Sequence, residues 1–274
     1  MKLLVTGLIA IFFFNGCDFH QPPEEIDLDL VYDDIPMYDE SNSSIPYEHE
    51  KFSDVIERSK LQLYTDGTTV DYGSLNNFKS PEFYVDNEEN LHFVISKELD
   101  TLKVRSELRE GPEVIEWSSA DSQGHFWVAT LKCLKPDIGV DSFTWMQIHG
   151  THETYNYPVL RLFWERSRAG KYDHLWAITI VSDPHTNNIY EYTDLGPRPA
   201  DFFSAEVHIQ NNIMDILINR KLIKTYNLTY WEEVKNYFKA GVYINRFGDG
   251  GEVSAIFQSL DFFDDPSKIV SAHH

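Results

Sequence analysis

The sequence is poor in cysteine and in basic residues, and it lacks a hydrophobic run long enough to span a membrane as a helix. Two cysteines in 274 residues exclude a disulfide-rich scaffold. Only 23 lysines and arginines face 44 aspartates and glutamates, and the formal net charge is −21. This balance argues against a nucleic-acid partner, because phosphate binding needs a net basic face. Hydrophobic residues nevertheless make up 42% of the chain and aromatic residues 14%, which excludes disorder of the whole chain.

The N-terminus has the pattern of an export signal. Residues 1–16 read MKLLVTGLIAIFFFNG, in which one lysine precedes a short apolar stretch. The residues before Cys17 resemble a bacterial lipobox, with Phe14 in place of the usual leucine. The resemblance implies a lipoprotein signal peptide that is cleaved before Cys17, and a lipid attached to that cysteine. We therefore expect a lipid anchor in the bacterial cell envelope, at the outer membrane or cell surface; the alternative is an ordinary cleaved signal and a secreted protein.

The segment after the signal is acidic. Residues 18–50 contain eleven aspartates and glutamates, four prolines and no lysine or arginine. Because this composition cannot bury enough apolar surface to fold, we expect residues 17–50 to be a disordered tether. Residues 51–274 then form one domain, since they show no internal repeat and no second boundary.

The body of the chain consists of short apolar and aromatic runs that are broken by glycine, proline, asparagine and aspartate. These runs are rich in β-branched residues and often alternate, which predicts β-strands in a sandwich, jelly roll or barrel. The best helix candidates are short, at about Tyr47–Lys60 and Thr229–Lys235. The predicted strands are Leu91–Ser96, Phe126–Leu134, Phe143–His149, Val159–Glu165, Leu175–Val181, Phe203–Ile209, Ile213–Ile218, Tyr237–Ile244 and Val253–Phe263.

Three segments place polar residues on one face of a strand, where alternate side chains point the same way. Cations, amides and phenols together indicate a groove for an anionic, hydroxyl-rich ligand; the alternative is the ordinary exposed face of a sheet. Four basic residues near position 168 (Arg161, Arg166, Arg168 and Lys171) are expected in a solvated loop; the alternative is that they extend a substrate subsite. The histidines lack the spacing of metal ligands, so we expect no metal and no cofactor. The residues on the polar faces are Arg105, Glu107 and Arg109; Gln147 and His149; and Tyr237, Lys239, Gly241, Tyr243 and Asn245.

Three blocks also resemble the signatures of polysaccharide lyase family 7, the alginate lyases. They are Arg-Ser-Glu-Leu-Arg (105–109), Gln-Ile-His (147–149) and Tyr-Phe-Lys-Ala-Gly-Val-Tyr (237–243), in the family's order and spacing. The resemblance implies an all-β jelly-roll sandwich of two antiparallel sheets, with a substrate cleft across the concave sheet. One departure is Asn245, where the family usually has glutamine.

The resemblance also implies a reaction, the β-elimination of alginate to an unsaturated uronate. Arg105 and Gln147, with His149 beside them, would neutralise the substrate carboxylate. Tyr243 would donate a proton to the leaving oxygen and would also be the base for mannuronate. Neutral His149 is the better base for guluronate. Five further residues belong to the expected substrate site. Arg109, Tyr237, Lys239 and Asn245 would contact the substrate, and Glu107 would orient one or both of the arginines that flank it.

Other functions stay open at this point. The same scaffold also serves non-catalytic carbohydrate-binding modules, and a related lyase would act on another polyuronate. A glycoside hydrolase is disfavoured, since Glu107 lies between two arginines that would hold it ionised. In the family, an isoleucine in the middle of Gln-Ile-His tends to accompany guluronate-containing substrates, so Ile148 favours such a substrate. We expect a monomer whose partner is the anionic polysaccharide alginate, and which meets a membrane only through its anchor.

Overall fold

The computed structural model describes residues 32–65, 67–98, 103–111, 116–136, 139–151, 157–183, 188–244 and 250–269. By contact the chain divides at Tyr32, and the compact unit that begins there is the one described below. The signal segment 1–16, Cys17 and Asn245 lie outside the described residues, so the predictions for them stay predictions. Within the described ranges, no helix has the length and apolar character needed to cross a membrane.

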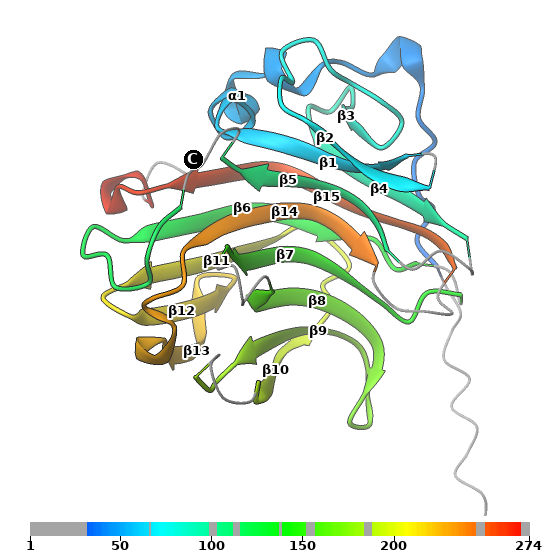
Figure 1. Cartoon of the computed structure of the whole chain (residues 1–274). Coiled ribbons are helices and arrows are strands. Elements are labelled where there is room, and N and C mark those ends of the chain that lie inside the picture. The colour runs from blue at the N-terminus through cyan, green and yellow to red at the C-terminus, as the bar shows by residue number, and fades with distance from the viewer. Residues whose placement is uncertain are drawn as a thin grey trace, which may run out of the picture. The chain divides into compact units, whose positions relative to one another are not determined.

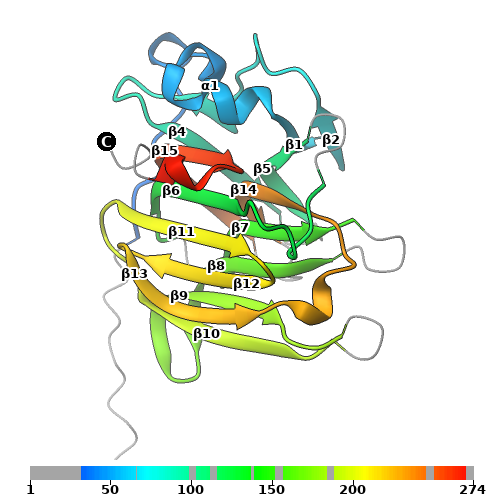
Figure 2. The ribbon, with the colours of Figure 1, turned by 90° about the vertical axis from the view of Figure 1, so that its left-hand side faces the viewer.

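Two antiparallel sheets make up the unit (Figure 1, Figure 2). The larger sheet has eight strands in the order β10-β9-β8-β7-β14-β5-β1-β2. Their bounds are Tyr190–Pro197 (β10), Lys171–Ile180 (β9), Pro158–Arg168 (β8), Ser142–Gly150 (β7), Asn236–Ile244 (β14), Val104–Glu110 (β5), Ser59–Thr65 (β1) and Thr68–Tyr72 (β2).

The smaller sheet has seven strands in the order β13-β12-β11-β6-β15-β4-β3. Helical structure in the described residues is limited to α1 (Glu50–Glu57) and four short 3-10 turns, at Glu40–Asn42, Pro46–Glu48, Thr229–Trp231 and Pro266–Ile269. The strand bounds are Lys221–Asn227 (β13), Ile213–Ile218 (β12), Phe203–Gln210 (β11), His125–Cys133 (β6), Gly251–Phe263 (β15), Leu91–Lys97 (β4) and Phe83–Val85 (β3).

The core lies between the two sheets and follows from the alternation of the strands. Trp127 of β6 contacts Trp145 of β7, with ring centroids 5.9 Å apart, so the aromatic side chains of opposite sheets interlock. Val104 and Leu108 of β5 also enter this core, which turns Arg105, Glu107 and Arg109 to the other side. We call that other side of the eight-stranded sheet its open face.

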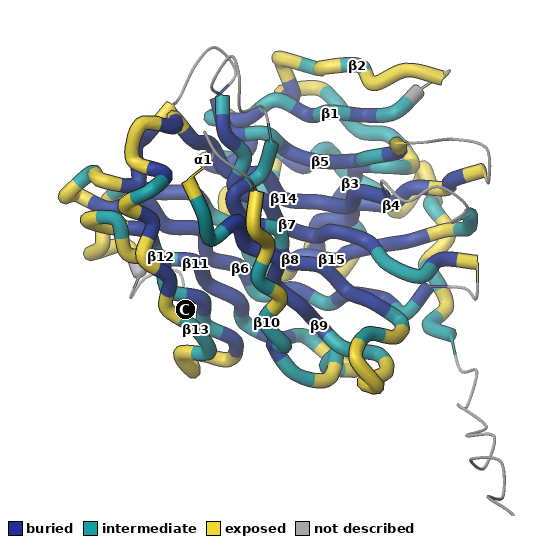
Figure 3. Tube along the Cα trace, turned by 60° about the horizontal axis from the view of Figure 1, so that its bottom comes forward, coloured by how far each residue is buried: buried dark blue, intermediate teal, exposed yellow. Residues whose placement is uncertain are grey.

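All nine predicted strands are present, and the predicted all-β sandwich of two antiparallel sheets is confirmed. The two helix predictions were too long. α1 ends at Glu57, because β1 takes up the chain from Ser59, and Thr229–Trp231 forms only a 3-10 turn. Figure 3 shows that buried residues follow the middle strands, whereas β2 is largely exposed.

The folded unit includes residues 32–50, which their composition assigns to the tether. The Asp33 carboxylate pairs with Arg198 at 3.0 Å, and Ser44 forms an isolated bridge with Val85 of β3. Pro46 is buried. A few anchoring contacts of this kind fix an acidic segment that has no hydrophobic pattern of its own.

β14 has a bulge against β7 just before Tyr243. Ala240 pairs with Met146 and Tyr243 with Thr144, so β14 has one residue more than β7 at this point. Gly241 lies in the bulge with a φ of +137°, and a Cβ atom there would lie 2.2 Å from the Ser106 carbonyl oxygen. Only glycine therefore fits at position 241 without a shift of backbone.

We predict that Gly241→Ala lowers the free energy of unfolding by about 2–4 kcal/mol, because the methyl group meets backbone and the φ is unfavourable for alanine. Gly73→Ala is the matched control, since a Cβ atom there meets nothing within 4 Å and its φ is ordinary. Urea unfolding of both variants checks the prediction. Equal midpoints for the two variants would contradict it.

Candidate functional site

A groove of about 970 Å³ crosses the open face of the eight-stranded sheet. Among the described residues it is lined by five cationic side chains and one acidic side chain, Glu116. A basic groove on a chain of net charge −21 is a local reversal of sign that attracts anions. The cationic residues are Lys103, Arg105, Arg109, Arg161 and Lys239.

The buried carboxylate of Glu107 lies beneath the groove and holds three of the groove residues. It accepts a hydrogen bond of 2.5 Å from the Gln147 amide and another of 2.5 Å from the Lys239 ammonium. Arg105 Nη1 lies 3.4 Å from the same carboxylate. Since Glu107 is only 1% exposed, it orients these groups and does not face a ligand itself. The expected contact of Glu107 with Arg105 is present, and those with Gln147 and Lys239 were not foreseen.

Lys239 is held deeper than a ligand-contacting lysine would be. Its side chain is 1% exposed and its ammonium is committed to Glu107. Burial lowers the pKa of Lys239 to about 8, against the opposing effect of the Glu107 charge. Its role in the structure is to compensate the buried carboxylate, because either charge alone at this depth would be costly.

Arg105 and Tyr243 face each other across neighbouring strands. They are direct partners in the register of β5 and β14, and the guanidinium lies 4.4 Å from the centre of the phenol ring. Arg105 Nη1 also donates to Gln62 at 3.4 Å, whereas its buried Nε has no hydrogen-bond partner among the described residues. Both side chains line the groove, so a cation and a phenol meet at one point of its floor.

His149 is arranged as a neutral hydrogen-bond acceptor. Its Nδ1 lies 2.9 Å from the Gly150 carbonyl oxygen, which can only accept, so Nδ1 carries the proton and Nε2 has a free lone pair. The ring stacks on Tyr237, and Arg109 lies 4.2 Å from the Tyr237 ring centre. Burial, reinforced by the charge of Lys239, lowers the pKa of His149 to about 4. An imidazole with these properties can accept a proton at neutral pH.

The structure brings nearly all the predicted site residues together. The groove lining contains Arg105, Arg109, Gln147, His149, Tyr237, Lys239 and Tyr243, and Glu107 lies directly below them. Asn245 lies outside the described residues, so its prediction is not tested.

The half of the groove formed by β8, β9 and β10 was not predicted from the sequence. The assignment of Arg161 to a solvated loop was wrong, since it lies inside β8 and lines the groove. The alternation of β8, in which Leu160 and Leu162 enter the core, was a usable signal for its position. Tyr190 and Tyr192 of β10 also line the groove. Within the described ranges, no three His, Cys, Asp or Glu residues are grouped to hold a metal ion.

We predict that the His149 ring protons titrate in an NMR experiment with a midpoint near pH 4. The folded pKa is then below the ordinary value of about 6.5. Between these pH values the unfolded chain binds more protons, so the free energy of unfolding falls as the pH falls from about 6.5 to 4. This fall should be smaller in His149→Gln. A midpoint near 6.5, with the same pH dependence of stability in the variant, would contradict the assignment.

This chain is similar to known proteins both in sequence and in fold. A sequence model described as "Alginate lyase" matches residues 56–264. An alginate lyase of Photobacterium sp. (strain ATCC 43367) is 27% identical over 260 residues, which cover 79% of this chain and 87% of that protein.

The solved structures share the fold at low sequence identity. Alginate lyase AlyC3 superposes with a TM-score of 0.70 and 19% identity, over 84% of this chain and 99% of its own. The alginate lyase from Klebsiella pneumoniae superposes with a TM-score of 0.63 and 14% identity, over 82% of this chain and 100% of its own. Alginate lyase A1-II′, a member of polysaccharide lyase family 7, superposes with a TM-score of 0.63 and 20% identity, over 80% of this chain and 98% of its own. The jelly-roll fold expected from the sequence is thus confirmed.

Proposed function

The chain belongs to the alginate lyase family and is a polysaccharide lyase, and from this premise we propose how its groove cleaves alginate by β-elimination. One observation carries the proposal. Neutral His149 and the phenol of Tyr243 line the same groove as Arg105 and Gln147. A base, an acid and a carboxylate-binding pair are the groups that the elimination needs.

The first requirement is to neutralise the substrate carboxylate, since the C5 proton is only weakly acidic while that carboxylate keeps its full charge. Arg105 supplies the cation and Gln147 an amide. Both are fixed by Glu107, so they need no reorganisation as charge develops on the carboxylate in the transition state. The basic lining of the groove favours the anionic polymer before the reaction begins.

The elimination then moves two protons and breaks one bond. A base removes the C5 proton, the C4–C5 double bond forms, and the bond from C4 to the glycosidic oxygen breaks. Tyr243 donates its phenol proton to that oxygen as it leaves. Arg105, over the phenol ring, stabilises the negative charge that this donation leaves on Tyr243.

The identity of the base depends on the sugar. In mannuronate the C5 proton and the leaving oxygen lie on the same side. Tyr243 then begins as the phenolate, stabilised by Arg105 over its ring, takes the C5 proton and passes it to the leaving oxygen. In guluronate the proton and the leaving oxygen lie on opposite sides, and Nε2 of His149 is the base. The neutral state of His149 supports the proposal that guluronate-containing substrate is accepted. Ile148 is buried in the core, so it can influence this choice only through the packing of β7.

Related structures have been solved with both kinds of sugar. AlyC3 has been solved in complex with dimannuronate, and a variant of A1-II′ in complex with the product GGG. The direct test of the proposal for this chain is the ultraviolet absorbance of unsaturated uronate, recorded separately on polymannuronate, polyguluronate and mixed alginate. A rise on any of them supports elimination, and its absence on all three rejects alginate as substrate.

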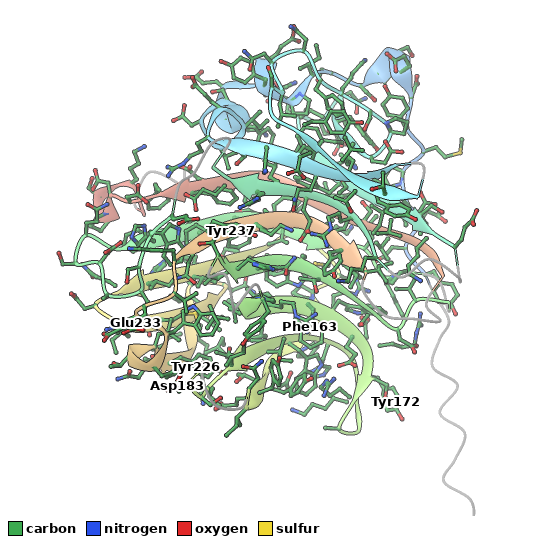
Figure 4. All side chains as sticks on the ribbon, in the orientation of Figure 1. Phe163, Tyr172, Asp183, Tyr226, Glu233 and Tyr237 are labelled. Atoms are coloured by element: carbon green, nitrogen blue, oxygen red, sulfur yellow. The ribbon has the colours of Figure 1, made fainter. Side chains whose placement is uncertain are left out.

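We predict that Tyr243→Phe lowers kcat by about a hundred- to ten-thousandfold while the thermal unfolding midpoint stays unchanged, because only the proton donor is lost. Tyr172→Phe makes the same chemical change at a 44% exposed tyrosine, which Figure 4 shows far from Tyr237 on the sheet. The control should keep full activity. Substantial turnover by Tyr243→Phe would refute the role of the phenol.

The two substrates should respond differently to His149→Gln. We predict a loss of about a hundredfold or more in kcat on polyguluronate, where His149 is the base, and a smaller loss on polymannuronate. His208→Gln, on β11 of the other sheet, is the control and should change neither rate. Equal losses on the two polymers would show that His149 is not a base specific to guluronate.

A further inference from the structure

We propose that Arg161 binds a substrate carboxylate, and that with Ile178 and Tyr192 it forms a subsite beside the catalytic residues. This inference rests on the proposed function, because it names where the neighbouring sugars of the same polymer lie. It concerns the half of the groove formed by β8, β9 and β10.

The register of the sheet places these residues in one line with the catalytic centre. Gln147 pairs with Arg161, Arg161 with Ile178, and Ile178 with Tyr192. Neighbouring strands lie about 4.8 Å apart, which is close to the length of one sugar in a 1,4-linked chain. A polymer that runs across the strands from Gln147 therefore places successive sugars over β8, β9 and β10.

Arg161 is the cation in this line that the protein leaves unused. Its side chain makes no hydrogen bond, ion pair or ring contact with any other residue that the structure describes. Glu165 lies on the same face of β8, but its carboxylate is bound by Arg168 through Nε and, at 3.2 Å, through Nη2. An unpaired guanidinium in the middle of a sheet suits an anionic ligand that arrives from outside.

The surface around Arg161 is apolar and aromatic. Phe163, Trp176 and Ile178 form a buried cluster of their own on the open face, separate from the main core. Tyr192, 44% exposed, contacts Phe163 edge-on with ring centroids 6.4 Å apart. In Figure 4, Phe163 lies below Tyr237 over the same sheet. A uronate offers an apolar ring face together with one carboxylate, and this combination of an apolar floor and one cation matches it.

The space around Arg161 is sufficient for a ligand on two sides. A side pocket of about 310 Å³ is lined by Arg161, Tyr192 and Tyr243, all of which also line the main groove. Arg161 therefore lies where the two hollows meet, and Tyr243 lines both of them as well. A carboxylate bound there belongs to a sugar adjacent to the cleaved bond.

The test is the binding of tetramannuronate and tetraguluronate by calorimetry, in a Tyr243→Phe background in which turnover is strongly reduced. Adding Arg161→Gln should raise Kd about tenfold on at least one of them, as expected for one lost charge-assisted contact. The salt dependence of Kd should become weaker, because one ionic contact is missing. Arg161→Lys should recover most of the affinity. Lys221→Gln removes the same charge from an exposed position on β13 and should have no effect.

Two results would overturn the inference. One is an unchanged Kd on both tetrasaccharides. The other is a weaker affinity with unaltered salt dependence and no recovery in Arg161→Lys, which would mean that Arg161 only supports the local structure. Failure of the proposed function looks different: the wild-type protein would bind these sugars through Arg161 and release no unsaturated uronate.

Discussion

The site depends on one buried carboxylate. Glu107 lies under the groove and holds Gln147, Lys239 and Arg105 through contacts of 2.5, 2.5 and 3.4 Å. Removing one partner of such a buried pair costs about 3–5 kcal/mol, because the remaining charge is left uncompensated. The ion pair of Glu107 with Lys239 neutralises the charge of Lys239 below the surface, whereas Arg105 faces the groove. A structural ion pair thus determines which cations reach a ligand.

Charge and fold act together across the open face. A strongly acidic chain presents a basic groove there. The carboxylate of Glu107 balances the charges of the cations near it, but not the charge of Arg161, which lies one strand beyond Gln147. The backbone also contributes to this arrangement. The bulge at Gly241 shifts the register of β14 against β7 just before Tyr243. The neutral state of His149 follows from burial between these cations. The groups that we propose as acid, base and carboxylate-binding pair therefore all depend on the packing of β5, β7 and β14.

The sequence predicted the parts of the fold that alternate and are buried on one side. Four of the strands it missed, β2, β3, β10 and β13, are the edges of the two sheets. β2 and β13 are mostly exposed and β10 has a single buried residue, so their sequences carry little apolar alternation. β3 is too short to show any. The catalytic half of the groove was predictable because its residues form compact blocks in the chain. Arg161 was given only an alternative role in a subsite, although the alternation of β8 was a usable signal for it. The tyrosines of β10 were not found, since strand pairing brings them to the groove. The burial of Lys239 could not be predicted from the sequence either, because it depends on which strands lie beside β14.

The most direct test of this account is a crystal structure of Tyr243→Phe with a bound alginate tetrasaccharide. The account predicts one uronate carboxylate between Arg105 and Gln147, with the adjacent glycosidic oxygen within hydrogen-bond reach of the position of the missing phenol oxygen. It also predicts that the sugar chain runs across the strands and not along them. A tetrasaccharide bound on the seven-stranded sheet, or one in the groove with its carboxylates away from Arg105, would contradict it.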